Sequence, residues 1–184
     1  MKNDSALKLS VMGLLIAIGI IIPMFSPIKI VLEPASFTLA SHVAIFIAMY
    51  ISPVMAVAVA VGTTAGFFLG GFPLVIVVRA ASHVVFAFVG AYYLQKAGGA
   101  SFSAVKLRVF SVIVALVHGF FEALVVSVFF YDGNMSQAYY QRGFLTSVVL
   151  LVGIGTVVHS MVDFEIANVV VLALRRQRAF QKLV

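Results

Sequence analysis

Apolar stretches long enough to cross a lipid bilayer follow one another along almost the whole chain. Of its 184 residues, 63% are hydrophobic and only 10% are charged. A water-soluble domain of this size would carry far more charge. Stretches of about 18 to 25 apolar residues match helices that cross a hydrocarbon core about 30 Å thick. The composition therefore predicts an all-α integral membrane protein.

Six transmembrane helices are predicted in a single domain that covers residues 1–184, with both termini in the cytoplasm. Their expected ranges are 7–25, 37–51, 53–70, 73–96, 106–131 and 143–174. The first range is interpreted as a span because no small-x-small cleavage site precedes Pro23. The stretch 26–35, between the first two spans, is apolar and carries two prolines. We expect it to fold back over the protein as a lid.

The positions of the basic residues give the expected orientation, because cytoplasmic loops carry an excess of Lys and Arg. The following fall on the side of the termini: Lys2, Lys8, Lys96, Lys106, Arg108, Arg175, Arg176, Arg178 and Lys182. Only Lys29 and Arg142 fall on the outer side. Topology thus accounts for the net charge of +6, and no nucleic-acid partner is expected.

Ionisable residues inside the predicted spans are the candidates for function, since a charge in lipid needs a partner, water or a ligand. Arg79 and His83 share one helix face at i,i+4, as do His118 and Glu122. At about 1.5 Å per residue, Arg79 and Glu122 lie about 9 and 6 Å below the outer surface, and His83 and His118 about 15 and 12 Å. We expect these four residues to line one pocket that opens outward. The alternative is an Arg79–Glu122 ion pair that only joins two helices.

The same depth count places His159 and Asp163 about 24 and 30 Å down the last span, away from the first group. That separation argues against a metal ion shared by His118, Glu122, His159 and Asp163, so no metal is expected. No cofactor and no catalytic residue are predicted either, because the sequence has no nucleophile motif and no nucleotide-binding glycine loop. The chain is not expected to be an enzyme. His42 has the weakest case among the four histidines, since its position early in the second predicted span is explained by a place beneath the lid.

Small residues at helical spacing, such as Gly13 and Ala17, allow helix backbones to approach closely. Spacing leaves open whether they pack inside the protein or bind another subunit. Aromatic residues near the outer side are candidate stacking surfaces for a ligand, namely Phe37, Phe72, Tyr139 and Tyr140.

The chain resembles the substrate-binding S components of energy-coupling factor vitamin transporters. The resemblance covers nearly the full length and rests on the stretches Gly13–Ala17, 33–43 and 62–73 and on the short helix before Ser52-Pro53. It implies a membrane-embedded binding subunit that captures a water-soluble vitamin outside the cell. The branch it resembles includes S components assigned to hydroxymethylpyrimidine, pyridoxine, niacin or pantothenate.

This family resemblance implies a bacterial cytoplasmic membrane location, a transmembrane scaffold (T) subunit that docks at Gly13 and Ala17, and two cytoplasmic ATPase subunits. The expected substrate-binding residues are Arg79, His83, His118, Glu122, Phe37 and Tyr139. An arginine beside a carboxylate suits hydroxymethylpyrimidine or a pyridoxine-like vitamin, which offer donors and acceptors. Niacin or pantothenate, held through a carboxylate, is the alternative. A self-contained carrier that relays protons through His83, His118 and Glu122 is a further alternative.

Overall fold

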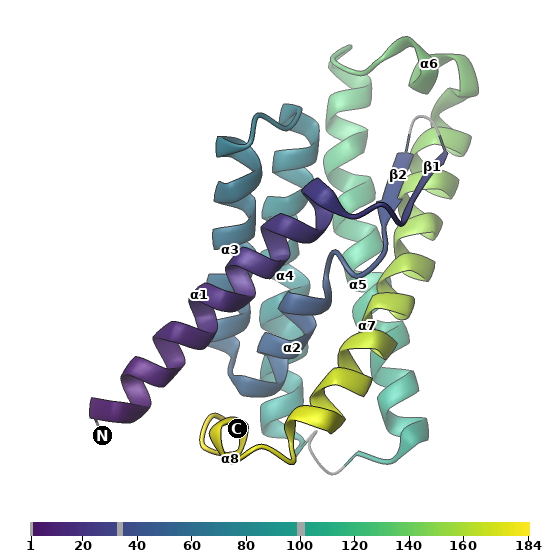
Figure 1. Ribbon diagram of the computed structural model, residues 1–184. Helices are drawn as coiled ribbons and strands as arrows, with labels where there is room; N and C mark the ends of the chain where they lie inside the picture. Colours follow the sequence, from purple (N-terminus) through teal and green to yellow (C-terminus); the bar gives the residue numbers. More distant parts are fainter. Residues whose placement is uncertain (1, 33–34, 99–101) are drawn as a thin grey trace.

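The computed structural model describes residues 2–32, 35–98 and 102–184 as a bundle of helices with one short hairpin (Figure 1). Glu33 and Pro34 of the expected lid lie outside the described residues. The helices are α1 (Lys2–Phe25), α2 (Val43–Ile51), α3 (Pro53–Leu69), α4 (Leu74–Lys96), α5 (Ala104–Tyr131), α6 (Gln137–Phe144), the π-helix η2 (Leu145–Ile154), α7 (Gly155–Leu174) and α8 (Arg178–Gln181).

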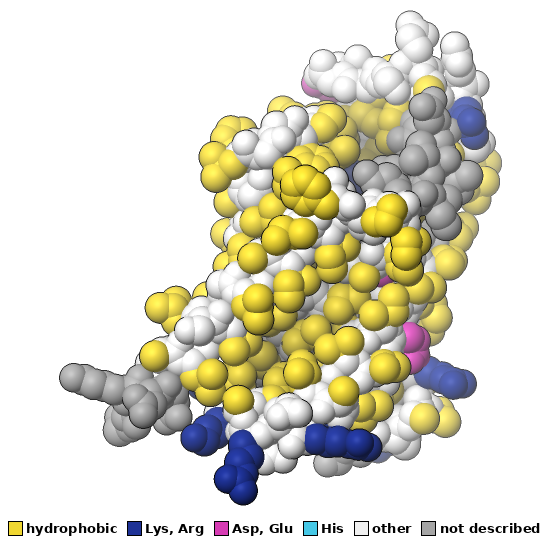
Figure 2. All heavy atoms as spheres, viewed as in Figure 1, with side chains coloured by type: hydrophobic (Ala, Val, Ile, Leu, Met, Phe, Trp, Pro, Cys, Tyr) yellow, Lys and Arg dark blue, Asp and Glu magenta, His cyan; other side chains and the backbone are white. Residues whose placement is uncertain are grey.

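Four helical segments of the described chain are long and apolar enough to cross a membrane: Ser5–Phe25, Leu74–Lys96, Ala104–Tyr131 and Gln137–Leu174. The apolar helix α3 is shorter. Hydrophobic side chains cover most of the face in Figure 2, while Lys and Arg gather at the end where both termini lie. These features are those of a membrane protein.

The prediction of a helix over residues 37–51 is wrong at its start. Helix α2 begins only at Val43 and has nine residues, about 14 Å of rise, which is too short to cross a hydrocarbon core. All nine side chains are buried, with α1, α3, α4 and α7 packed around them. Ser52 ends α2 in an extended conformation, and its side chain accepts a hydrogen bond from the Met55 amide at the start of α3.

The segment before α2 forms a hairpin, so the all-α prediction misses two strands. Strand β1 (Lys29–Leu32) pairs antiparallel with β2 (Ala35–Thr38), with Ile30 opposite Phe37. Pairing satisfies backbone groups that would otherwise be unpaired in an apolar loop. The expected folding back of this stretch thus takes the form of a β-ribbon, which leads directly into α2.

The predicted helix over residues 143–174 is not a single regular α-helix. Gly143, the last residue but one of α6, has a φ of +74° and kinks the chain just before η2. The ten residues of η2 are π-helical, and α7 continues from them to Leu174. A π-helical segment is wider than an α-helix and is frequent at functional sites.

Helix α1 runs obliquely across the bundle and packs on α3 (Figure 1). Glycines allow this close contact: a Cβ added at Gly62 would lie 2.6 Å from Ile16 Cδ1, and one at Gly19 would lie 2.6 Å from Thr63 Oγ1. Gly13 differs, because no atom lies within 4 Å of a Cβ built there and the residue is exposed. Ala17 is half-buried.

Candidate functional site

Glu122 of α5 is the centre of a polar cluster inside the bundle. Its Oε2 accepts hydrogen bonds from Arg79 Nη2 of α4 at 2.7 Å and from Thr156 Oγ1 of α7 at 2.6 Å. Its Oε1 lies 3.0 Å from His83 Nε2 and 3.6 Å from His118 Nε2. The structure brings these four ionisable residues together, and Thr156 adds a contact from a third helix.

Asp163 of α7 forms a second polar centre at the start of α2. Its Oδ1 accepts from the Ala40 amide at 2.7 Å, and its Oδ2 accepts from the His42 amide at 2.9 Å. The same Oδ2 lies 3.1 Å from His42 Nδ1 and 3.3 Å from His159 Nε2. Ser41 Oγ lies 3.0 Å from His159 Nε2. The carboxylate therefore fixes the turn that leads into α2.

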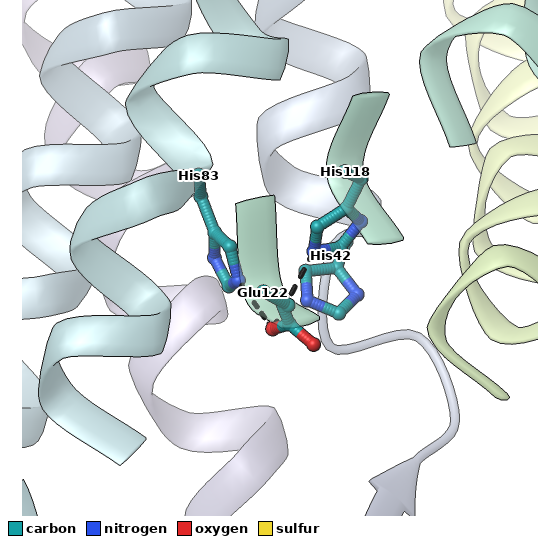
Figure 3. Close-up of side chains that lie close together, drawn as sticks. All are labelled: His42, His83, His118 and Glu122. Carbon is teal, nitrogen blue, oxygen red and sulfur yellow. Dashed lines mark hydrogen bonds and ion pairs between the residues drawn. The ribbon is translucent and has the colours of Figure 1, made fainter. Parts of the chain in front are cut away.

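His42 joins the two centres into one site. Its ring centroid lies 4.8 Å from that of His83, 4.6 Å from that of His118 and 5.1 Å from that of His159. Figure 3 shows the His42, His83 and His118 rings converging on the Glu122 carboxylate. The prediction that His159 and Asp163 belong to a separate neighbourhood is wrong, and so is the low weight given to His42.

The depth count failed because it measured α5 from its inner end only. Helix α5 has 28 residues, about 42 Å of rise, and therefore exceeds a core about 30 Å thick. Counted from Tyr131, at the end predicted to face outward, His118 lies about 20 Å down, close to the depth expected for His159. With this correction, the depth count no longer argues against a metal ion bound by residues of both groups.

A partly open cavity lies against this cluster. Phe67 and Phe72 stack with ring centroids 4.7 Å apart on its wall, and Phe37 lies 5.5 Å from His159. The lining residues are Pro23, Phe37, Thr38, Ser41, His42, Ile45, Thr63, Phe67, Phe72, Ile76, Arg79, Ala80, His83, Glu122, Thr156 and His159. Aromatic walls with a few convergent polar groups are typical of a small-molecule site.

Three buried side-chain atoms of this region have no hydrogen-bond partner among the described residues: Thr63 Oγ1, Arg79 Nε and His118 Nε2. Thr63 and Arg79 line the cavity. Because buried polar groups are nearly always paired, these atoms indicate where a bound molecule or ion would interact.

The expected ligand residues differ in their placement. Phe37 lines the cavity, whereas Tyr139 packs with Val126, Val148 and Val152 in a small cluster and is not among the described lining residues. His118, expected to line the same pocket as Arg79, His83 and Glu122, is not among the described lining residues either. Sequence reasoning assigned no ligand role to Ser41, Thr63 or Thr156. Short hydroxyl side chains are common in apolar helices, so no sequence signal singles them out.

Apolar helices of membrane-spanning length that enclose a polar, aromatic-lined cavity define an integral membrane protein with an internal binding site. Over 166 residues the chain is 39% identical to the niacin transporter NiaX of Lactococcus lactis subsp. cremoris (strain MG1363). The aligned region covers 90% of this chain and 73% of that protein. The chain belongs to the family of S components of energy-coupling factor vitamin transporters. No family model and no solved structure matches it.

Proposed function

We propose that this chain is the niacin-binding S component of an ATP-driven vitamin importer. The observation that carries the proposal is its 39% identity to a niacin transporter over 90% of its length. This similarity favours niacin, given above as an alternative, over hydroxymethylpyrimidine or a pyridoxine-like vitamin.

The polar groups of the cavity support a ligand that carries a carboxylate on an aromatic ring. Arg79 Nε and Thr63 Oγ1 are buried donors without a partner among the described residues, and both residues line the cavity. A nicotinate carboxylate can accept from both, and a hydrogen bond from a guanidinium is the stronger kind. Phe37, Phe67 and Phe72 offer ring surfaces on which a pyridine ring can stack.

Membrane topology and partner subunits belong to the same proposal. The end of the bundle that holds both termini is rich in Lys and Arg (Figure 2). This supports a cytoplasmic position for both termini in a bacterial membrane. The proposed topology has six membrane segments, of which the short α2 is the second. The exposed Gly13 and the half-buried Ala17 on α1 support docking of the scaffold subunit, itself driven by two ATPases. Uptake by the purified chain alone in liposomes would instead indicate the self-contained carrier.

Equilibrium binding to the detergent-solubilised chain tests the ligand. We expect nicotinate to bind more tightly than hydroxymethylpyrimidine, pyridoxine or pantothenate. Thr63→Val should weaken nicotinate binding by about 2- to 10-fold, the value of one hydrogen bond. Thr64→Val is the matched control, because Thr64 Oγ1 already donates to the Ala60 carbonyl. Equal or tighter binding of one of the other vitamins would overturn the assignment.

Co-purification with the scaffold and ATPase subunits tests the docking surface. Gly13→Leu should abolish co-purification and leave nicotinate affinity unchanged, because Gly13 is exposed on α1 and does not line the cavity. Thr63→Val should weaken nicotinate binding and leave co-purification unchanged. If both variants lose the same activity, the separation of docking and binding surfaces is wrong.

A further inference from the structure

One ring nitrogen of the buried His118 lacks a hydrogen bond within the described part of the chain. Its side chain is 0% exposed, and its Nδ1 lies 3.1 Å from Ser160 Oγ. Its Nε2 has no hydrogen-bond partner among the described residues and lies 3.6 Å from Glu122 Oε1, too far for a hydrogen bond. Ser160 Oγ can accept from Nδ1 or donate to it, depending on the tautomer. When Nδ1 carries the proton, Nε2 turns its lone pair toward a carboxylate oxygen, and a positive group between the two atoms would stabilise this arrangement.

Four potential metal ligands meet at this point. One ligand atom each from His42, His83, His118 and Glu122 lies within 4.8 Å of the others, and all four residues are buried. The side chains come from the turn before α2, from α4 and from α5 and converge in Figure 3. Imidazole nitrogen and carboxylate oxygen bind zinc at about 2.0–2.2 Å in a tetrahedral site. The 3.0 and 3.6 Å separations from Glu122 Oε1 to His83 and His118 are compatible with that arrangement.

The outer contacts of these ligands also suit a metal site, where ligating groups are held by further hydrogen bonds. Glu122 Oε2 accepts from Arg79 and Thr156, which leaves Oε1 facing the imidazoles. Ser160 holds the Nδ1 of His118, and Asp163 Oδ2 lies 3.1 Å from the Nδ1 of His42. His42 and His118 can therefore each present Nε2 to one ion.

The charge balance of the site favours a cation. With neutral imidazoles, Arg79 contributes one positive charge, whereas Glu122 and Asp163 contribute two negative charges, so the cluster carries a net charge of −1. Such a surplus is unfavourable among apolar helices. A divalent cation changes the balance to +1, which then suits an anionic ligand in the adjoining cavity.

We propose that His42, His83, His118 and Glu122 bind one divalent transition-metal ion of the zinc class at the base of the cavity. Imidazole also binds copper, nickel and iron. A tetrahedral set of nitrogen and oxygen ligands, however, favours zinc. A second possible group, His42 with His159 and Asp163, is less suited, because Asp163 already accepts two backbone hydrogen bonds. The proposal does not depend on which vitamin is bound.

Metal analysis of the full chain, purified without a histidine tag, tests this site. We expect zinc at one ion per chain, and Co²⁺ added to the metal-depleted protein should give the visible absorption of a tetrahedral complex. His118→Gln and His83→Gln should each weaken Co²⁺ binding by at least about 10- to 100-fold. His159→Gln is the matched control and should retain the affinity of the unmodified chain.

Two results would overturn the proposal. One is Co²⁺ affinity that is no higher in the unmodified chain than in His118→Gln, which would leave a proton as the positive group between His118 and Glu122. The other is loss of Co²⁺ binding in His159→Gln but not in His118→Gln, which would move the ion to the second group. Far-UV circular dichroism of each variant shows that it is folded, so a loss of metal reports on the ligands.

Discussion

Removing one charge from the Arg79–Glu122 pair tests how strongly this contact holds α4 to α5. The Nη2–Oε2 distance is 2.7 Å, and the two side chains are 14% and 4% exposed. Glu122→Gln keeps the size of the side chain and one acceptor oxygen but removes the negative charge. Because a guanidinium cannot release its proton in a protein, Arg79 then remains charged and loses its counter-ion.

The expected magnitude follows from this geometry. Two unit charges about 4 Å apart attract by about 4 kcal/mol at an effective dielectric constant of about 20. Removing one partner of a buried pair costs about 3–5 kcal/mol. We therefore expect Glu122→Gln to lower the free energy of unfolding by that amount. Arg79→Met with Glu122→Gln leaves no unpaired charge, so the double variant should be more stable than the sum of the single effects by about 2–3 kcal/mol.

The assay is unfolding by sodium dodecyl sulfate in mixed micelles, followed by far-UV circular dichroism because the chain has no tryptophan. Arg108→Met and Glu165→Gln change exposed charges and should alter the free energy of unfolding by less than about 0.5 kcal/mol. The reasoning is refuted if the effects of Arg79→Met and Glu122→Gln add within about 0.5 kcal/mol. That result would mean that solvent or lipid headgroups already compensate the arginine.

Two glycine substitutions test close contacts around the site. A Cβ at Gly155 would lie 2.6 Å from Phe37 Cζ, so Gly155→Ala should displace this ring and weaken nicotinate binding by about 5- to 10-fold in equilibrium binding. Gly153→Ala, whose nearest neighbour is 3.6 Å away, should leave the affinity unchanged, and equal losses would contradict a role for Phe37. A Cβ at Gly119 would lie 2.6 Å from the Gly153 carbonyl oxygen, which belongs to backbone, so Gly119→Ala should lower the free energy of unfolding by about 1–3 kcal/mol. Gly13→Ala should not change it, and similar stability of both variants in detergent unfolding would disprove the tight α5–η2 contact.

Hydropathy and charge spacing sufficed to predict the long helices and the central ion pair. The apolar stretches that became α3, α4 and α5 end at Gly70, Lys96 and Asp132, where turn residues and charges interrupt them. Arg79 and Glu122 were matched because an arginine in an apolar helix requires a partner at similar depth.

Residue counting could not predict how far each helix extends beyond its neighbours. The depth of His118 depends on how far the 28-residue α5 extends beyond the other helices, and the depth of His159 depends on the π-helical η2 that precedes α7. His42 was undervalued for a similar reason. The place of His42 follows from the position of α2 inside the bundle. From the sequence alone, an apolar stretch of this kind is predicted to be an ordinary span.

The shortness of α2 is what makes a polar site inside these apolar helices possible. A helix that began at the membrane surface would satisfy its first amides there with water. Helix α2 instead begins inside the bundle, and in the turn just before it the amides of Ala40 and His42 donate to Asp163. The positive end of a helix stabilises such a carboxylate, while Ala40 adopts a left-handed φ of +68°, a conformation that costs about 1–2 kcal/mol. The Asp163 hydrogen bonds offset this strain, and the same turn carries His42 to the point where α4, α5 and α7 contribute their polar side chains. The late start of α2 is therefore the structural reason that one histidine can lie between the two carboxylate centres.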